Sequence, residues 1–255
     1  MENFGASLAW GLVIGGSLVA GAVAAALLRL PERVAATLTA FGGWILLAAI
    51  ALELVPEADR EAGTALTAIG LLAGTLVYVG ADWWLGRGEH MMAMRRSGHA
   101  AAAGRPMDMG SASSEATRGE SIAVGLFVDG VPESIALGLT IADGEIGVAL
   151  LAGVLVGNVV EAYGAAQPIV AGGHSRRFAI ALLTAIGFTL AFATVLGGTV
   201  LADASGELVG TAQAVAGGAV LAVVSIAIVP HAFSEVNRAV ASATVAGFIA
   251  GYLLS

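Results

Sequence analysis

Residues 121–170 read SIAVGLFVDGVPESIALGLTIADGEIGVALLAGVLVGNVVEAYGAAQPIV. The stretch contains two apolar runs, 121–141 and 146–170, separated by a short acidic turn. About 20 consecutive apolar residues are enough for a helix to cross the hydrocarbon layer of a membrane. The stretch therefore predicts two membrane-spanning helices, which are antiparallel neighbours because only a few residues connect them.

The composition of the whole chain agrees with a membrane protein. Of its 255 residues, 58% are hydrophobic and 12% are charged, whereas about a quarter of an ordinary soluble domain is charged. Six further apolar runs bring the expected number of spans to eight: 5–28, 34–55, 64–86, 178–201, 208–229 and 238–254. We therefore expect an all-α polytopic membrane protein. The first run lacks the basic flank of a signal peptide, so it is expected to be retained.

The arginines predict the orientation of the spans. Short loops rich in arginine stay on the cytoplasmic side of a membrane, and the chain contains no lysine. With the N-terminus outside, Arg60 alone falls on the outer side. The other ten arginines fall inside: Arg29, Arg33, Arg87, Arg95, Arg96, Arg105, Arg118, Arg176, Arg177 and Arg238. We therefore expect both termini to be extracytoplasmic. The net charge of −8 gives no support for nucleic-acid binding.

One long polar segment divides the chain into three parts. Residues 87–120 lack apolar periodicity, which predicts a flexible cytoplasmic loop between spans in 1–86 and spans in 121–255. The loop holds two histidines and five of the six methionines: His90, His99, Met91, Met92, Met94, Met107 and Met109. Thioether and imidazole groups suit soft metals, so the loop either collects metal ions or is a linker of biased composition.

A weak internal repeat relates the second apolar run to the seventh. Leu54-Val55-Pro56-Glu57-Ala58 has a counterpart in Ile228-Val229-Pro230-His231-Ala232, and Gly43 before it has one in Gly217. The arginine pattern makes these two runs antiparallel. Inverted repeats of this kind are typical of alternating-access transporters. Chance similarity between two apolar sequences is the alternative explanation.

Acidic and amide side chains interrupt the two central runs. Asp129 and Glu133 are four residues apart, and Asn158 and Glu161 are three apart, so each pair shares one helix face. Pro132 between the first two removes a backbone hydrogen bond and exposes a carbonyl group near position 128. Both pairs lie near the middle of their runs, where a charged side chain usually faces a cavity or an ion.

Three carboxylates close together in a medium of low dielectric constant cannot all stay ionised without compensation. Either they are protonated and serve helix packing, or they bind a divalent cation that exchanges with protons. Glu53, in the second run, lies nearer the outer surface. It is either a ligand at the entrance of a cation path or an interfacial acid.

These motifs resemble those of the ZIP family (zinc/iron-regulated transporter-like) of divalent-metal transporters. That family carries His-Asn-x-Pro-Glu-Gly in its fourth span, where this chain has Asp129-Gly130-Val131-Pro132-Glu133-Ser134. Its fifth span carries His or Gln, a polar residue, two further positions and Glu, where this chain has Gly157-Asn158-Val159-Val160-Glu161. The resemblance implies eight transmembrane helices in an inverted 3+2+3 arrangement. It also implies that spans one, four, five and six move against the rest.

The same resemblance implies a set of metal ligands. Asp129, Glu133 and Glu161 would form a first site, in which Gly157 lacks the fourth ligand, and Asn158 with the two glutamates would form a reduced second site. All these ligands are oxygen atoms, which favours Mn²⁺, Mg²⁺ or Ca²⁺ relative to an imidazole site, while Zn²⁺ and Fe²⁺ can still bind. The identity of the metal therefore stays open between Zn, Mn and Fe.

The function expected from these observations is uptake of a divalent metal cation into the cytoplasm, across the cell inner (plasma) membrane. One alternative is a ZIP-like scaffold or sensor that does not transport and whose metal site has degenerated, and another is a proton-coupled carrier of an organic solute. We expect no enzyme activity, because cysteine is absent and no histidine lies at the depth of the acids. Gly70-x-x-x-Gly74 and Gly153-x-x-x-Gly157 allow close helix packing or a homodimer.

Overall fold

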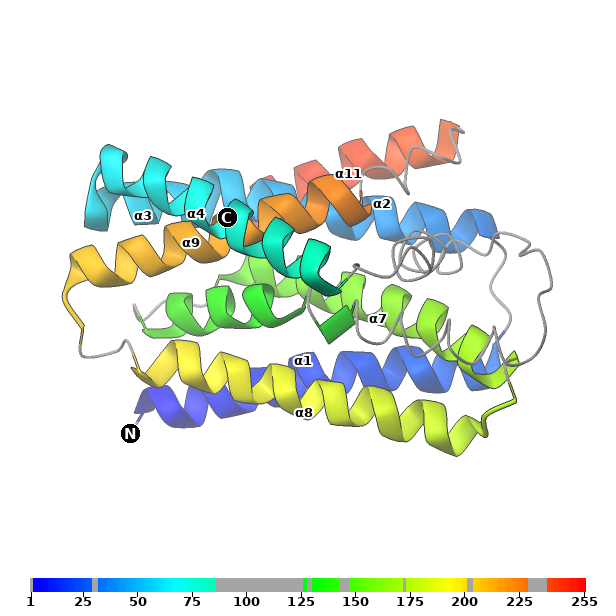
Figure 1. The fold of residues 1–255 in the computed structure, drawn as a ribbon. Helices are drawn as coiled ribbons and strands as arrows, with labels where there is room; N and C mark the ends of the chain where they lie inside the picture. Colours follow the sequence, from blue (N-terminus) through cyan, green and yellow to red (C-terminus); the bar gives the residue numbers. More distant parts are fainter. Residues whose placement is uncertain are drawn as a thin grey trace.

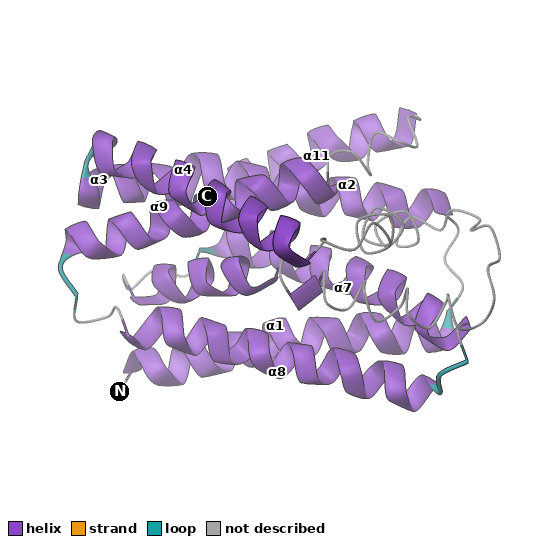
Figure 2. Cartoon of the chain, viewed as in Figure 1, coloured by secondary structure: helices purple, strands orange, loops and turns teal. Residues whose placement is uncertain are grey.

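The computed structural model describes residues 2–28, 32–85, 126–127, 130–142, 147–171, 173–200, 204–228 and 238–255. Helices make up nearly all of this part of the chain, and it contains no strand (Figure 2). The helices run roughly along one common direction as a bundle (Figure 1). The predicted all-α class is therefore confirmed, while residues 87–120 lie outside the described ranges.

Hydrophobicity and length explain where the helices form. Their bounds are α1 (Glu2–Leu27), α2 (Glu32–Ala49), α3 (Val55–Ala62), α4 (Thr64–Leu85), α7 (Val148–Ala171), α8 (Arg176–Val200), α9 (Gly206–Val223) and α11 (Arg238–Leu254). A further helix covers Gly130–Ala142 and is called helix 130–142 below. Each of the eight apolar runs thus contains helix.

Six of the described helices are long and apolar enough to cross a membrane, which supports a multi-pass membrane protein. The segments Gly130–Ala142 and Arg238–Leu254 are apolar but shorter. A helix needs about 20 residues to cross the hydrocarbon layer, at a rise of about 1.5 Å per residue. The expectation of eight spans is therefore supported for six of them, and the other two belong to the proposal below.

Two π-helical segments lie at matching places in the chain. Segment η1 (Ile50–Leu54) joins α2 to α3, and η2 (Val224–Ile228) follows α9. In η1 the N–H group of Val55 donates to the carbonyl group of Ile50, five residues back. Pro56 follows directly, and a proline clashes with the carbonyl group four residues before it. The wider π turn relieves this clash, so one continuous helix runs from Ala36 to Ala62.

Three helices in the first part of the chain each have a counterpart in the last part, at a constant distance in the sequence. The first residues of α1 and α8 are Glu2 and Arg176, those of α2 and α9 are Glu32 and Gly206, and those of α4 and α11 are Thr64 and Arg238. Each pair is 174 residues apart. Segments η1 and η2 keep this spacing, and the two members of each pair run in opposite directions along the bundle (Figure 1).

Small residues decide which helices pack together. A Cβ atom added to Gly15 of α1 would lie 2.6 Å from the carbonyl oxygen of Gly187 in α8, so these two backbones touch. Gly70 of α4 packs in the same way against Ala214 of α9, and Gly251 of α11 packs against Ala48 of α2. Such close approach gives helices van der Waals contact where lipid removes the hydrophobic driving force.

The helix ends gather at two opposite ends of the bundle. The start of α1, the junction of α3 with α4 and the start of α9 lie at one end (Figure 1). The end of α7 and the start of α8, which carries Arg176 and Arg177, lie at the other. Arg176 and Arg177 thus lie at the opposite end of the bundle from Glu57, Asp59 and Glu61 of α3.

Candidate metal site

Helix 130–142 carries two buried polar side chains. Glu133 is 6% exposed and Ser134 is 0% exposed. The hydroxyl oxygen of Ser134 has no hydrogen-bond partner within the part of the chain that the structure describes. Gly130 and Gly138 bring this helix against α8, where an added Cβ at Gly130 would lie 2.8 Å from the side chain of Leu190. Glu133 therefore faces protein and does not face lipid.

Helix α7 carries the other candidate ligands. Asn158 is 2% exposed, and its amide nitrogen has no partner among the described residues. Glu161, one turn further along, is half-buried. A buried amide N–H group without an acceptor costs free energy, which marks the surroundings of this nitrogen as a place where a hydrogen-bond acceptor can bind.

Gly157, beside Asn158, faces open space. Among the described residues, no heavy atom lies within 4 Å of a Cβ atom added there, whereas one added at Gly153, four residues earlier, would lie 2.7 Å from the side chain of Leu46. Position 157 is therefore the place on this part of α7 where a side chain can be added without displacing a neighbouring helix.

The start of α7 and the end of helix 130–142 are held together by a hydrogen bond from the N–H group of Gly147 to the hydroxyl oxygen of Thr140, at 3.2 Å. Counted from this bond at about 1.5 Å per residue, Glu133 lies about 10 Å along helix 130–142, and Asn158 about 16 Å along α7. The two helices run in opposite directions (Figure 1).

The directions of the side chains reduce the remaining offset between Glu133 and Glu161. In a helix, side chains lean toward the N-terminus. Because the helices are antiparallel, Glu133 leans toward the depth of Glu161, and Glu161 leans toward the depth of Glu133. This general lean shortens the separation of the two carboxyl groups along the bundle axis, which is about 10 Å by residue count.

Within the described ranges, no three His, Cys, Asp or Glu side chains lie close enough together to hold a metal ion. Asp129, the third predicted acid, lies outside these ranges, as does His231. The structure thus places Glu133, Asn158 and Glu161 on neighbouring antiparallel helices, and it does not place Asp129.

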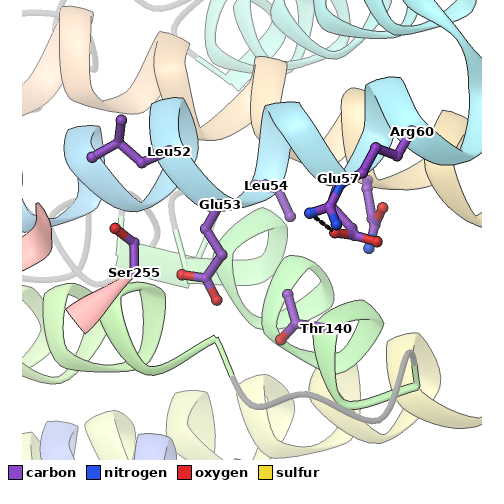
Figure 3. Close-up of a pocket in the computed structure, with 8 residues that line it drawn as sticks. Leu52, Glu53, Leu54, Glu57, Arg60, Thr140 and Ser255 are labelled. Atoms are coloured by element: carbon purple, nitrogen blue, oxygen red, sulfur yellow. Dashed lines mark ion pairs between the residues drawn. The ribbon is translucent and has the colours of Figure 1, made fainter. Parts of the chain in front are cut away.

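Glu53, the fifth predicted ligand, lies apart from Glu133, Asn158 and Glu161. It lies in segment η1 and lines a pocket of about 220 Å³. Figure 3 shows its carboxyl group pointing from η1 toward the helix that carries Thr140. A Cβ atom added at Gly147 would lie 2.7 Å from the carboxylate oxygen Oε1 of Glu53. Glu53 therefore lies at the start of α7, about 16 Å from Asn158 along that helix.

Sequence analysis gave no role as ligands to the other polar residues of this pocket, which we call the outer pocket. They are Glu57, Arg60, Thr140, Gln213 and Ser255, beside the apolar Leu52 and Leu54. Glu57 and Arg60 form an ion pair at its edge (Figure 3). Gln213 is 0% exposed, and the residues of α9 that follow it are all apolar. Such an isolated polar residue in an apolar run was the signal available from the sequence.

A polar network also joins the opposite half of α7 to α1. The amide nitrogen of Gln167 donates to the hydroxyl oxygen of Tyr163 at 2.7 Å, and the hydroxyl group of Tyr163 donates to the carbonyl oxygen of Leu28 at 3.4 Å. This network gives Gln167 a role in holding α7 against the end of α1. His174, beyond it, stacks on Phe178.

Two comparisons of the sequence with known proteins found no match. No protein-family model matches the chain, and no curated protein matches its sequence. The resemblance to ZIP transporters therefore depends on the motifs themselves.

Proposed function

We propose that this protein carries a divalent metal cation across a membrane by alternating access, with Glu133, Asn158 and Glu161 among the ligands of the transported ion. The observation that carries the proposal is the burial of an acid and an amide on two adjoining antiparallel helices of a membrane protein. Glu133 is 6% exposed and Asn158 is 2% exposed. Buried charges are usually paired or coordinate a metal.

The ligand chemistry supports a divalent cation as the substrate. Carboxylate and amide oxygens suit Mn²⁺ and other hard cations, and they bind Zn²⁺ or Fe²⁺ with the order expected for first-row metals. Asp129, four residues before Glu133 in the sequence, would supply a further carboxylate. As the resemblance to ZIP transporters implies, the cation would move from the outside into the cytoplasm.

The regular spacing of the helices supports alternating access. Three pairs of helices repeat after 174 residues and run in opposite directions, as an inverted repeat requires. In the proposal, the six long helices, α7 among them, and the two shorter ones, Gly130–Ala142 and Arg238–Leu254, together form an eight-span protein with a 3+2+3 arrangement. Helices α1, α7, α8 and helix 130–142 would move together, since α1 packs along both α7 and α8.

The proposal is tested by uptake of radiolabelled Mn²⁺ and Zn²⁺ into vesicles that contain the purified protein. Glu133→Gln keeps the size of the side chain and removes its charge. Loss of a direct ligand costs at least as much as loss of an outer-shell partner, so we expect the initial rate of uptake to fall by about tenfold or more.

Glu207→Gln is the matched control, because Glu207 is an exposed acid on α9 far from helix 130–142 in the chain. Its uptake is expected to equal that of the wild type. Uptake by the wild type and by Glu133→Gln that equals the uptake of vesicles without protein, with both proteins folded, would contradict the proposal. That result would favour the ZIP-like scaffold or sensor that does not transport, for which the missing side chain at Gly157 is the structural argument.

A further inference from the structure

We propose that the outer pocket is a second cation site, which receives a divalent cation that still holds its shell of water. Three oxygen-bearing side chains from three separate elements line it: the carboxylate of Glu53, the hydroxyl group of Thr140 and the amide group of Gln213. Glu53 comes from η1, Thr140 from helix 130–142 and Gln213 from α9. Oxygen atoms of these kinds are the ligands that hard cations prefer.

The size of the pocket fits a hydrated ion. Its volume is about 220 Å³. A water molecule occupies about 30 Å³ of liquid, so the pocket has room for about seven waters. Small hard cations such as Mg²⁺ are octahedral and give up their water reluctantly. The pocket can therefore hold such an ion with its first shell of water, and the side chains would bind it largely through that water.

The charges around the pocket favour a cation. Glu53 and Glu57 carry two negative charges, and Arg60 carries one positive charge at the edge, where its side chain is 70% exposed. Arg60 is paired with Glu57 at the edge of the pocket, and the carboxylate of Glu53 lies further inside it. This pairing also explains why Arg60 is the arginine that does not follow the positive-inside pattern.

The outer pocket and the buried site are separate. Glu53 lies beside Gly147 at the start of α7, about 16 Å along that helix from Asn158. An ion cannot contact both at once. The inference extends the proposed function, because the outer pocket would receive the ion before it loses water in the buried site, and substitutions can remove either site alone.

The test measures binding of Mn²⁺ alone to the purified full-length protein in lipid nanodiscs, by electron paramagnetic resonance of the free ion. We expect a tighter and a weaker class of bound Mn²⁺. Glu53→Gln removes the one full charge inside the outer pocket, so it should weaken the second class by about tenfold or more. Glu133→Gln should remove the first class and leave the second.

Arg60→Gln gives a change of the opposite sign. It removes the positive charge at the edge and frees the carboxylate of Glu57, so binding of the weaker class should tighten. Exposed ion pairs contribute little, so the expected change is about two- to fivefold. Asp59→Asn is the control, since Asp59 is an exposed acid of the same helix that does not line the pocket. It should change neither class.

Two results would overturn the second site. One is Mn²⁺ binding that is unchanged in both Glu53→Gln and Thr140→Val. The other is Glu53→Gln that unfolds at lower temperature but binds Mn²⁺ as the wild type does, which would show that the carboxylate only stabilises the start of α7. If Glu53→Gln does not fold, Thr140→Val and Arg60→Gln decide. Binding lost in Glu53→Gln but kept in Glu133→Gln would support the outer pocket and contradict the buried site.

Discussion

Glycine decides where side chains can be added to α7. Gly153 is closed by Leu46, Gly147 lies against the carboxylate of Glu53, and Gly157 opens onto space with no heavy atom within 4 Å. In the motif of the ZIP family, position 157 carries a ligand with a ring nitrogen or an amide. In the proposed site, the chain would therefore combine an oxygen-only set of ligands with room for one more.

Gly157→His should shift the preference of the protein from Mn²⁺ toward Zn²⁺. Imidazole nitrogen suits Zn²⁺, and the Cβ atom of the histidine would meet no heavy atom of the described residues within 4 Å. We expect the ratio of Zn²⁺ uptake to Mn²⁺ uptake to rise by about tenfold, measured with both ions in competition. Gly80→His, at an open and exposed position of α4, is the control. An unchanged ratio in Gly157→His would argue against a ligand position at 157.

At the scale of the helices, packing depends on contacts between backbones. Gly15 of α1 lies against Gly187 of α8, while Gly16, the next residue, has nothing within 4 Å of an added Cβ atom. Both are glycines in the same apolar helix, so hydropathy does not distinguish them. The position of α8 alone decides that a larger side chain would collide with a neighbour at Gly15 and would not at Gly16.

Gly15→Ala should therefore destabilise the protein, and Gly16→Ala should not. The added methyl group of Gly15→Ala would lie 2.6 Å from the oxygen of Gly187, and forced overpacking costs about 1–3 kcal/mol. Gly16→Ala has no such contact and gains up to about 1 kcal/mol of helix propensity. Thermal unfolding in detergent, followed by circular dichroism, measures both. A midpoint for Gly15→Ala equal to that of Gly16→Ala would contradict the close packing of α1 on α8.

At the scale of the whole molecule, the two ends of the bundle differ in charge. The end that carries α3 and the start of α9 is acidic, and the end that carries the start of α8 begins with Arg176 and Arg177. From the positive-inside rule we predict that the second end faces the cytoplasm. The start of α1 lies at the first end, as expected for an N-terminus outside the cell (Figure 1).

Labelling of single cysteines tests this orientation, and the chain has no cysteine of its own. Asp59→Cys and Glu207→Cys should react with a membrane-impermeant maleimide in intact cells. Ser175→Cys, an exposed residue between α7 and α8, should react only after the membrane is permeabilised. The reverse pattern would invert the topology and, with it, the proposed direction of transport.

The sequence by itself determined the helical class and the approximate extent of the six long spans, and it predicts the sidedness of the loops. These properties are sums over neighbouring residues, such as twenty apolar side chains in a row or two arginines beside each other, so they need no knowledge of distant contacts. The match of Pro56 with Pro230 likewise predicted the spacing at which η1 and η2 occur.

Only the tertiary structure decided that Glu53 belongs to an outer pocket with Thr140 and Gln213, away from Asn158. It also distinguished the open Gly157 from the closed Gly153. Pockets and close contacts are formed by residues that lie far apart in the chain, and every apolar helix presents similar faces to the possible partners. Which faces meet depends on the fit of small residues against a particular neighbouring backbone, and the hydropathy of the sequence does not predict that fit.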